Sequence, residues 1–382
     1  MPQPTPAGGQ PGVNPDPYGS WSGTPENAAL KPAHVLLARP EWRQVHGEWL
    51  RGRLLSHLDS SRSVYRFLST GAISLIYTEP DEVLFQVESR LTTEPDRHVA
   101  GALICVLGRH LHARPGDVDL ILSRLAARRG SPYLVDPGQD GPKFDTLAEA
   151  VVHCLTTLTV RYGTHFADAT IRARLSTPID NTTTVALIAG HLRGILNPAD
   201  PSLRDAQRKA FDLLTLTLEP LRVAWADSTQ AENALTIAEG VAQEVYHASG
   251  AFKAELQSRR ELGDPEVFAS LALPLLDGVG HVRYPAVTHH IIQTVEHLGD
   301  AQPKPALLLA MRVITEDSRY ITESLGVDAV LKLINRYIAD HRVLVLGDPE
   351  YTTAVRVLLE RFVRVGWPQA VQMAERMDEL FH

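Results

Sequence analysis

The sequence predicts an all-α fold, on three observations. From Pro40 onward, apolar residues recur at spacings of three and four, the period of a helix with one buried face. The apolar/polar alternation of a half-buried strand is almost absent. Proline, glycine and aspartate interrupt the pattern about every 15 to 25 residues, as they do between helices. The predicted helices cover residues 41–58, 60–77, 80–92, 97–112, 115–129, 144–162, 165–175, 180–196, 201–222, 228–248, 250–262, 265–278, 285–298, 303–316, 318–340, 349–365 and 367–381.

Several of these helices have clear start signals. "RPGD" at 114–117, "GDPE" at 263–266 and "GWP" at 366–368 each place a proline at the start of a helical pattern. Proline suits the first turn because the N–H that it lacks has no partner within the helix there. These tripeptides and tetrapeptides therefore predict where the chain enters a helix.

The C-terminal part of the chain carries a repeat signal. "GDPEVFASLALPLLDGVG" begins at Gly263, and "GDPEYTTAVRVLLERFVRVG" begins 84 residues later, which is twice 42. Between them, "GDAQPKPALLLAMRVITED" begins at Gly299 with the same Gly-Asp opening. Three predicted helix pairs follow, namely 265–278 with 285–298, 303–316 with 326–340, and 349–365 with 367–381.

A two-helix unit of about 40 residues is the period of HEAT and armadillo repeats. The last 120 residues or so therefore resemble a HEAT/armadillo-like α-solenoid. The resemblance implies stacked antiparallel helix pairs, with the second helix of each pair lining a concave surface. A single pair cannot bury its own apolar face, so each pair needs neighbours on both sides.

The predicted domain organisation has three parts. Residues 1–36 are rich in proline and glycine and poor in large aliphatic residues, which predicts a disordered tail. A helical region covers 37–130, and a helical-repeat region covers 144–382. The glycine- and proline-rich stretch 129–145 is either a domain boundary or a long loop, so the two regions alternatively form one continuous solenoid.

The stretch "RYPAVTHHIIQTVEH" places His289, His290 and His297 within nine residues. On a helix, His290 and His297 lie at the edge of the buried stripe, roughly 10 Å apart along the axis. His289 is predicted to point to the opposite face, near Gln293. No two of these histidines are three or four residues apart, so one helix cannot supply a metal site. We interpret them as a polar edge that meets a partner and makes the contact sensitive to pH.

Other polar residues of the repeat region extend this predicted surface. In the helix within 321–342, Lys332, Asn335 and Arg336 face away from the buried stripe, and the final helix carries Gln372 and Arg376 among its apolar residues. The predicted partner-binding residues are His289, His290, Gln293, His297, Lys332, Asn335, Arg336, Gln372 and Arg376.

Two groups of arginines support an alternative function, the binding of nucleic acid. They are Arg39, Arg43, Arg51 and Arg53 beside two tryptophans, and Arg124, Arg128 and Arg129 at a predicted helix end. The formal net charge of −8 and the 6% aromatic content argue against a general binder of phosphate backbones or of single strands.

Motifs that carry a catalytic mechanism are absent from the sequence. It contains no phosphate-binding G-x-x-x-x-G-K-[ST], no H-E-x-x-H and no paired-cysteine zinc pattern. We therefore predict no catalytic residue, no metal and no cofactor. The predicted function is a non-enzymatic scaffold or adaptor that binds another protein through its concave face. An enzyme with an unfamiliar helical active site is the second alternative.

The expected location is the cytoplasm. The chain has only two cysteines, which does not suggest a disulfide framework, and its first residues lack the basic and apolar regions of a signal peptide. No apolar run approaches the length of about 20 residues that crosses a membrane. The expected partner is thus another protein, not nucleic acid and not a membrane.

Overall fold

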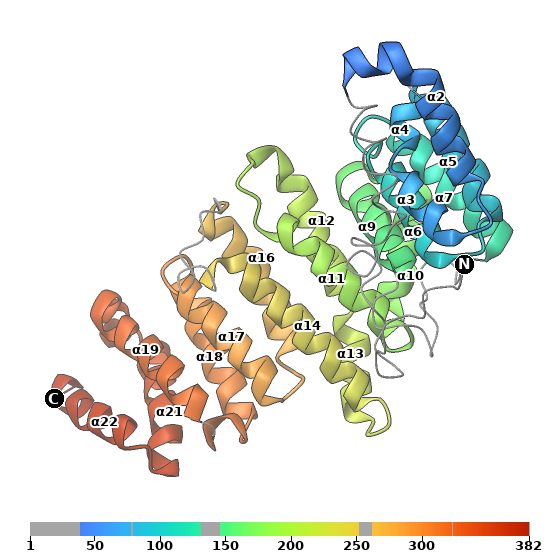
Figure 1. Cartoon of the computed structure of the whole chain (residues 1–382). Coiled ribbons are helices and arrows are strands. Elements are labelled where there is room, and N and C mark those ends of the chain that lie inside the picture. Colours follow the sequence, from blue (N-terminus) through green and yellow to red (C-terminus); the bar gives the residue numbers. More distant parts are fainter. Residues whose placement is uncertain (1–38, 78, 131–145, 252–261, 323, 382) are drawn as a thin grey trace, which may run out of the picture. The chain divides into compact units, whose positions relative to one another are not determined.

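The computed structural model describes residues 39–77, 79–130, 146–251, 262–322 and 324–381. Over these ranges all regular secondary structure is helical (Figure 1), which confirms the predicted all-α class. The predicted tail 1–36, nearly all of the stretch 129–145 and most of the predicted helix 250–262 lie outside the described residues. The chain divides into two compact units, residues 1–169 and 170–382, which are described separately. The predicted division between 130 and 144 stays a prediction.

Unit 1 is built around α6. The helix packs between α3 and α9, and α5 contacts both α6 and α7. Leu103 and Leu107 of α6, Leu122 of α7 and Leu155 of α9 are fully buried in this core. The helices are α2 (Pro40–Leu58), α3 (Ser63–Thr70), α4 (Ile73–Ile76), α5 (Pro80–Thr93), α6 (Arg97–Gly108), α7 (Pro115–Arg129), α9 (Thr146–Thr157) and the π-helix η1 (Leu158–Tyr162).

A buried carboxylate joins the end of unit 1 to its core. Asp119 of α7 accepts hydrogen bonds from Thr164 Oγ1 at 2.8 Å and from the N–H groups of Phe166 at 3.1 Å and Ala167 at 2.9 Å. These N–H groups belong to the first turn of α10 (His165–Ser176), where they lack partners within the helix. Asp119 therefore caps α10 from another helix.

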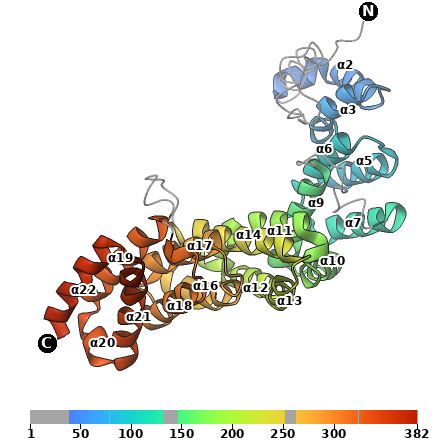
Figure 2. The same cartoon turned by 90° about the horizontal axis from the view of Figure 1, so that it is seen from below.

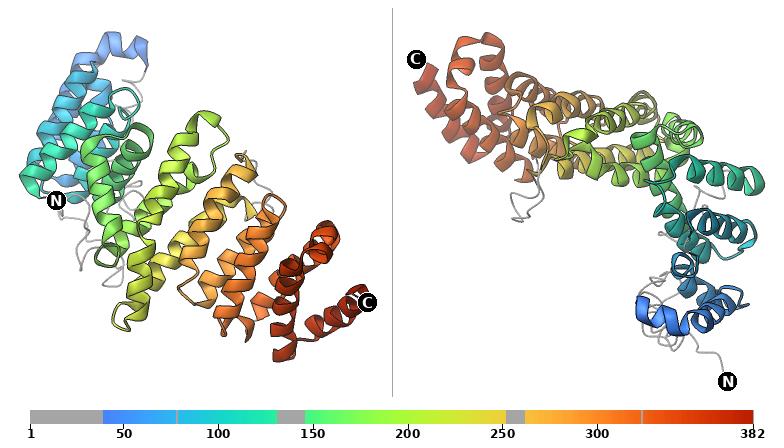
Figure 3. Two further views of the ribbon diagram at one scale, coloured as in Figure 1. Left: turned by 180° about the vertical axis from the view of Figure 1, so that it is seen from behind. Right: turned by 90° about the horizontal axis from the view of Figure 1, so that it is seen from above.

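Unit 2 consists of two rows of stacked helices. In the first row, α14 packs between α11 and α17, α17 contacts α19, and α19 contacts α22. In the second row, α16 packs between α12 and α18, and α18 contacts α21. Figure 2 and the right panel of Figure 3 show both rows edge-on. The helices after α10 are α11 (Thr182–Leu196), α12 (Arg204–Thr215), α13 (Leu218–Ala226), α14 (Ala231–Ser249), α16 (Pro265–Val279), α17 (Pro285–Leu298), α18 (Pro303–Glu316), α19 (Ser324–Asp340), α20 (Arg342–Gly347), α21 (Pro349–Val365) and α22 (Pro368–Phe381).

The two "GDPE" sequences open helices as predicted. Asp264 is the N-cap of α16 and accepts from the N–H of Glu266 at 3.0 Å, and Asp348 is the N-cap of α21 and accepts from the N–H of Glu350 at 2.9 Å. The third Gly-Asp pair differs. Asp300 lies beyond the end of α17, and its carboxylate forms an ion pair with Arg336 of α19.

Three predicted helices are broken in the structure. The predicted helix 201–222 is divided into α12 and α13, because Pro220 has no N–H to continue the hydrogen bonding of α12. The predicted helix 60–77 is divided into α3 and α4 at Gly71. In place of the predicted helix 318–340, a 3₁₀ turn η4 (Tyr320–Thr322) precedes α19.

Candidate functional site

The predicted partner-binding residues lie on α17, α19 and α22, which belong to the same row of unit 2. Lys332, Asn335, His297, Gln372 and Arg376 are exposed, whereas His289, His290, Gln293 and Arg336 are half-buried. The sequence therefore placed these residues on neighbouring helices, but they are not equally available to a partner.

His289 does not lie on an open face of α17. Its side chain points toward η4, where its Nδ1 lies 3.2 Å from the hydroxyl of Tyr320. His290 packs toward α14, with its ring centroid 5.5 Å from that of Tyr246 and 6.4 Å from that of His289. A helical projection predicts only which residues of α17 share a face, and η4 covers the face that was expected to be solvated.

Arg336 is occupied within the fold. Its Nε donates to Asp300 at 3.1 Å, a terminal nitrogen also contacts that carboxylate, and another donates to the carbonyl of Glu296 at 2.6 Å. The guanidinium thus binds the C-terminal end of α17, where free carbonyls and the helix dipole favour a cation. Arg336 holds two neighbouring helices together.

The second predicted basic group has a similar role in unit 1. Arg124 of α7 contacts Glu88 of α5 at 3.3 Å, Arg128 donates to the hydroxyl of Thr92 at 3.0 Å, and Arg129 donates to the carbonyl of Thr92 at 2.8 Å. All three arginines therefore bridge α7 and α5. This arrangement leaves them less available to bind phosphates than the sequence suggests.

The first predicted basic group lies at and within α2. Arg39 and Arg53 are exposed, Arg51 is half-buried, and the side chain of Arg43 lies outside the described residues. Trp42 and Trp49 on the same helix are 42% and 70% exposed. Arg51, Arg53 and the two tryptophans thus share one helix, and Arg39 directly precedes it.

Two of the predicted residues, His289 and His290, line a cavity of about 370 Å³ in unit 2. The other lining residues are Tyr284, Pro285 and Ala286 at the start of α17, and Arg319 and Tyr320 from the turn before α19. A volume near the lower limit of ligand pockets suits a side chain or a small molecule. Aromatic rings, imidazoles and one guanidinium provide both apolar contact and hydrogen-bond donors.

A buried carboxylate holds one wall of this cavity in place. Asp317 is 2% exposed and accepts from the N–H groups of Arg319 at 3.1 Å and Tyr320 at 3.3 Å, and from Thr288 Oγ1 of α17 at 2.9 Å. Gly326 provides room for the ring of Tyr320, since a Cβ at this position would approach that ring to 2.9 Å. Arg319 and Tyr320 were not predicted as site residues, and only the turn-forming "EDSRY" offers a signal for them in the sequence.

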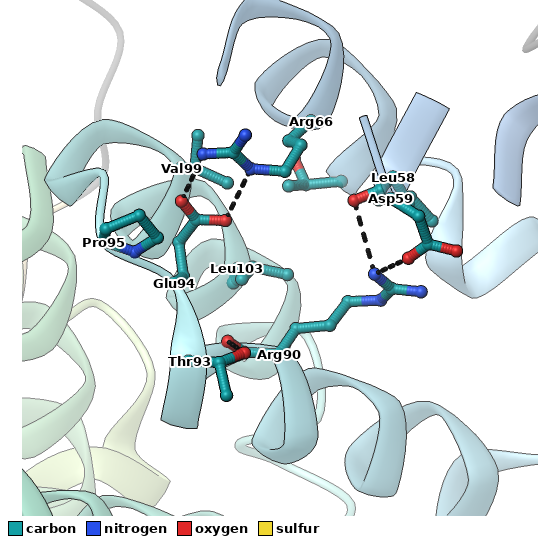
Figure 4. Close-up of a pocket in the computed structure, with 10 residues that line it drawn as sticks. Leu58, Asp59, Arg66, Arg90, Thr93, Glu94, Pro95, Val99 and Leu103 are labelled. Atoms are coloured by element: carbon teal, nitrogen blue, oxygen red, sulfur yellow. Dashed lines mark hydrogen bonds and ion pairs between the residues drawn. The ribbon is translucent and has the colours of Figure 1, made fainter. Parts of the chain in front are cut away.

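A second polar cavity, of about 270 Å³, lies in unit 1 (Figure 4). Arg66 donates from Nε to Glu94 at 2.9 Å and from a terminal nitrogen to the same carboxylate at 2.7 Å. Arg90 donates to Asp59 at 2.6 Å. Both guanidiniums therefore have a carboxylate partner, and this cavity is held together by its own charges.

Among the described residues, no group of three His, Cys, Asp or Glu side chains has the arrangement of a metal site. Every described helix is also too short or too polar to cross a membrane. Compared with known proteins, the chain matches no protein-family model and no curated protein sequence.

The buried position of His290 predicts a dependence of stability on pH. Burial, followed by the nearby His289 and His247, lowers the pKa of His290 from 6.5 to about 4. The unfolded chain therefore binds this proton at a higher pH than the folded chain does. The free energy of unfolding should fall as the pH decreases from about 6.5 toward 4, by about 1 kcal/mol at pH 5 after screening by solvent is allowed for.

Thermal unfolding of wild type and His290→Gln between pH 7 and pH 5 measures this effect. The variant should lose less stability than wild type over the same range. Burial also lowers the pKa values of His110 and His247, so some acid sensitivity should remain. Equal pH dependence in the two proteins contradicts the prediction.

Proposed function

We propose that this chain is a non-enzymatic helical-repeat protein, of the HEAT/armadillo-like kind, that binds another protein. The observation that carries the proposal is the stacking of unit 2, in which each helix of a row contacts the preceding and the following helix of that row. Such stacks present a long continuous surface, and binding to protein segments is a common use of it.

The row of α17, α19 and α22 is the proposed binding face. It carries the exposed Lys332 and Asn335 on α19 and the exposed Gln372 and Arg376 on α22. Exposed polar side chains on neighbouring helices suit a protein partner, because they provide specific contacts without an apolar patch that would cause aggregation.

Charge reversal on this face provides the test. The double variant Lys332→Glu/Arg376→Glu should capture the partner at least about fivefold less than wild type, because opposed charges at an interface repel. The matched control is Lys209→Glu, an exposed lysine on α12 in the other row. Arg336 is unsuitable as a probe because it binds α17.

The measurement is quantitative mass spectrometry of proteins that co-purify with the tagged full-length chain from its native cell. The partner should be retained by wild type and by Lys209→Glu and reduced with the double variant, while all three proteins unfold within about 2 °C of one another. Loss of the partner with Lys209→Glu alone, or equal capture by all three, contradicts the proposed face.

A further inference from the structure

Arginines in this fold repeatedly combine two kinds of acceptor. In unit 1, Arg66 donates to the carbonyl of Ser60 at 2.9 Å. It also donates to the carboxylate of Glu94, as Figure 4 shows. Arg90 donates to the carbonyl of Leu58 at 3.4 Å and to the carboxylate of Asp59. In each case a backbone carbonyl fixes one part of the guanidinium and a carboxylate neutralises its charge.

The same arrangement occurs twice in unit 2. Arg312 of α18 donates to the carbonyl of Asp277 and, from Nε at 2.7 Å, to the carboxylate of that residue in α16. Arg336 combines the carbonyl of Glu296 with the carboxylate of Asp300. Arg312 connects α18 with α16 within the second row, and Arg336 connects α19 with α17 within the first row. The paired acceptors are therefore part of the stacking within each row.

Arg319 of the same unit donates to a backbone carbonyl but has no carboxylate acceptor among the described residues. It donates to the carbonyl of Arg283 at 3.2 Å, and its guanidinium carbon lies 5.4 Å from the centroid of the Tyr284 ring. The backbone N–H of Arg319 donates to the carboxylate of Asp317 at 3.1 Å. Arg319 is exposed, and its side chain lines the 370 Å³ cavity. Among the residues that the structure describes, the ion pairs of the nearby carboxylates are made by other cations, and none includes Arg319. The guanidinium is thus positioned in advance, with donors left for a ligand.

The neighbouring charges leave this position available to an anion. Glu316 is engaged by Arg283 at 3.4 Å and by Arg312 at 3.5 Å. Asp317 has its oxygens occupied by Thr288 and by two backbone N–H groups. The nearest other titratable groups that line the cavity are the two histidines and the two tyrosines. The low pKa of His290, about 4, keeps that ring neutral near pH 7.

We infer that the cavity bounded by Tyr284, His289, His290, Arg319 and Tyr320 binds a carboxylate group, which Arg319 pairs with as Arg312 and Arg336 pair with carboxylates of the chain itself. The imidazoles and the tyrosine rings enclose the group and its carbon chain. This inference deepens the proposed function and rests on it in one respect: the carboxylate belongs to an acidic side chain of the partner protein. A free small carboxylic acid is the other source of the same chemistry.

Binding is measured by NMR on the full-length chain with ¹³C-labelled histidine, using two blocked tripeptides, acetyl-Ala-Glu-Ala-amide and acetyl-Ala-Gln-Ala-amide, as probes. His289→Gln and His290→Gln assign the two ring signals. The Glu tripeptide should shift both signals saturably. The Gln tripeptide should bind about tenfold more weakly than the Glu tripeptide, because its neutral amide cannot form the charged hydrogen bonds to Arg319. Sodium acetate, compared with sodium chloride, tests a free carboxylate.

Arg319→Gln should abolish these shifts, and Arg319→Lys should weaken binding, because lysine keeps the charge but loses the planar pair of donors. The matched control is Arg342→Gln, an exposed arginine on α20, which should bind as wild type does. Shifts with the Glu tripeptide alone assign a peptide source, and shifts with acetate as well assign the carboxylate itself as sufficient.

Two results overturn the inference: no saturable shift with either carboxylate at 20 mM, or shifts that persist in Arg319→Gln. Neither depends on the partner, so the two proposals fail separately. If Lys332→Glu/Arg376→Glu loses the partner while the cavity binds no carboxylate, the protein-binding face stands without this site. If the cavity binds acetate while partner capture is unaffected by that double variant, the site stands without the face.

Discussion

Replacing Phe268 with alanine should lower the free energy of unfolding of unit 2 by about 3–5 kcal/mol. Phe268 of α16 is completely buried, and its ring meets that of Phe211 in α12 edge to face, with centroids 5.8 Å apart. The two helices are neighbours in the second row. Alanine would leave a cavity between them and remove the aromatic contact, and stacked helices cannot close such a gap without moving their neighbours.

Urea unfolding gives the size of the effect, and hydrogen exchange gives its location. In a stack where each helix contacts only its neighbours, protection should fall most in α12, α14 and α16 and less toward α21 and α22. The matched control is Phe85→Ala, because Phe85 of α5 is 66% exposed and should change stability by less than about 0.5 kcal/mol. A uniform loss of protection throughout unit 2 contradicts nearest-neighbour stacking.

The sequence predicted those parts of the fold that depend on neighbouring residues. The starts of α16 and α21 formed as expected, and their caps are local too, because Asp264 and Asp348 need only their own first helical turn to accept a hydrogen bond. Asp300 has the same preceding glycine, yet it binds Arg336, 36 residues further along the chain. A dipeptide cannot distinguish a cap from an ion-pair partner when the deciding residue is supplied by the next helix.

The candidate site was only half predicted, for the same physical reason. His289 and His290 stood out as charged or polar residues in a helix with a clear apolar stripe. Arg319 and Tyr320 complete the cavity from a short turn that has no periodicity, and they reach α17 only because Asp317 binds Thr288 across the two elements. The sequence did not predict that this turn covers the face of α17 that carries His289.

The pairing of the arginines in the fold could not be predicted from the sequence either. Arg124, Arg128 and Arg129 suggested a basic patch because their partners, Glu88 and Thr92, are about 36 residues earlier in the chain. The sequence shows every charged residue, but it does not show which charges are paired in the fold. Paired charges are less able to bind phosphates than unpaired ones. Arg319 is the opposite case. No sequence pattern marks it, and it differs from the other arginines only because the fold supplies no described carboxylate to pair with it.

Glu94→Gln should lower the free energy of unfolding of unit 1 by about 3–5 kcal/mol, because it breaks a buried ion pair from one side. Glu94 and Arg66 are 7% and 15% exposed, and their two hydrogen bonds are 2.9 and 2.7 Å long. This contact raises the pKa of Arg66. The guanidinium still stays charged when the contact is lost, because the ordinary pKa of arginine lies far above neutral pH. The Gln amide would turn one acceptor into a donor facing Arg66 and would leave a desolvated cation unpaired.

A double-mutant cycle separates this cost from the loss of packing. Arg66→Met/Glu94→Gln removes the charge as well, so it should be more stable than the sum of the two single changes implies, by about 2 kcal/mol. Glu88→Gln is the matched control, since its ion pair with Arg124 is 3.3 Å long and Arg124 is 51% exposed, and it should cost less than about 1 kcal/mol. Equal costs for Glu94→Gln and Glu88→Gln would contradict the prediction, because water would then screen the Arg66–Glu94 pair of Figure 4 as fully as the more exposed Glu88–Arg124 pair.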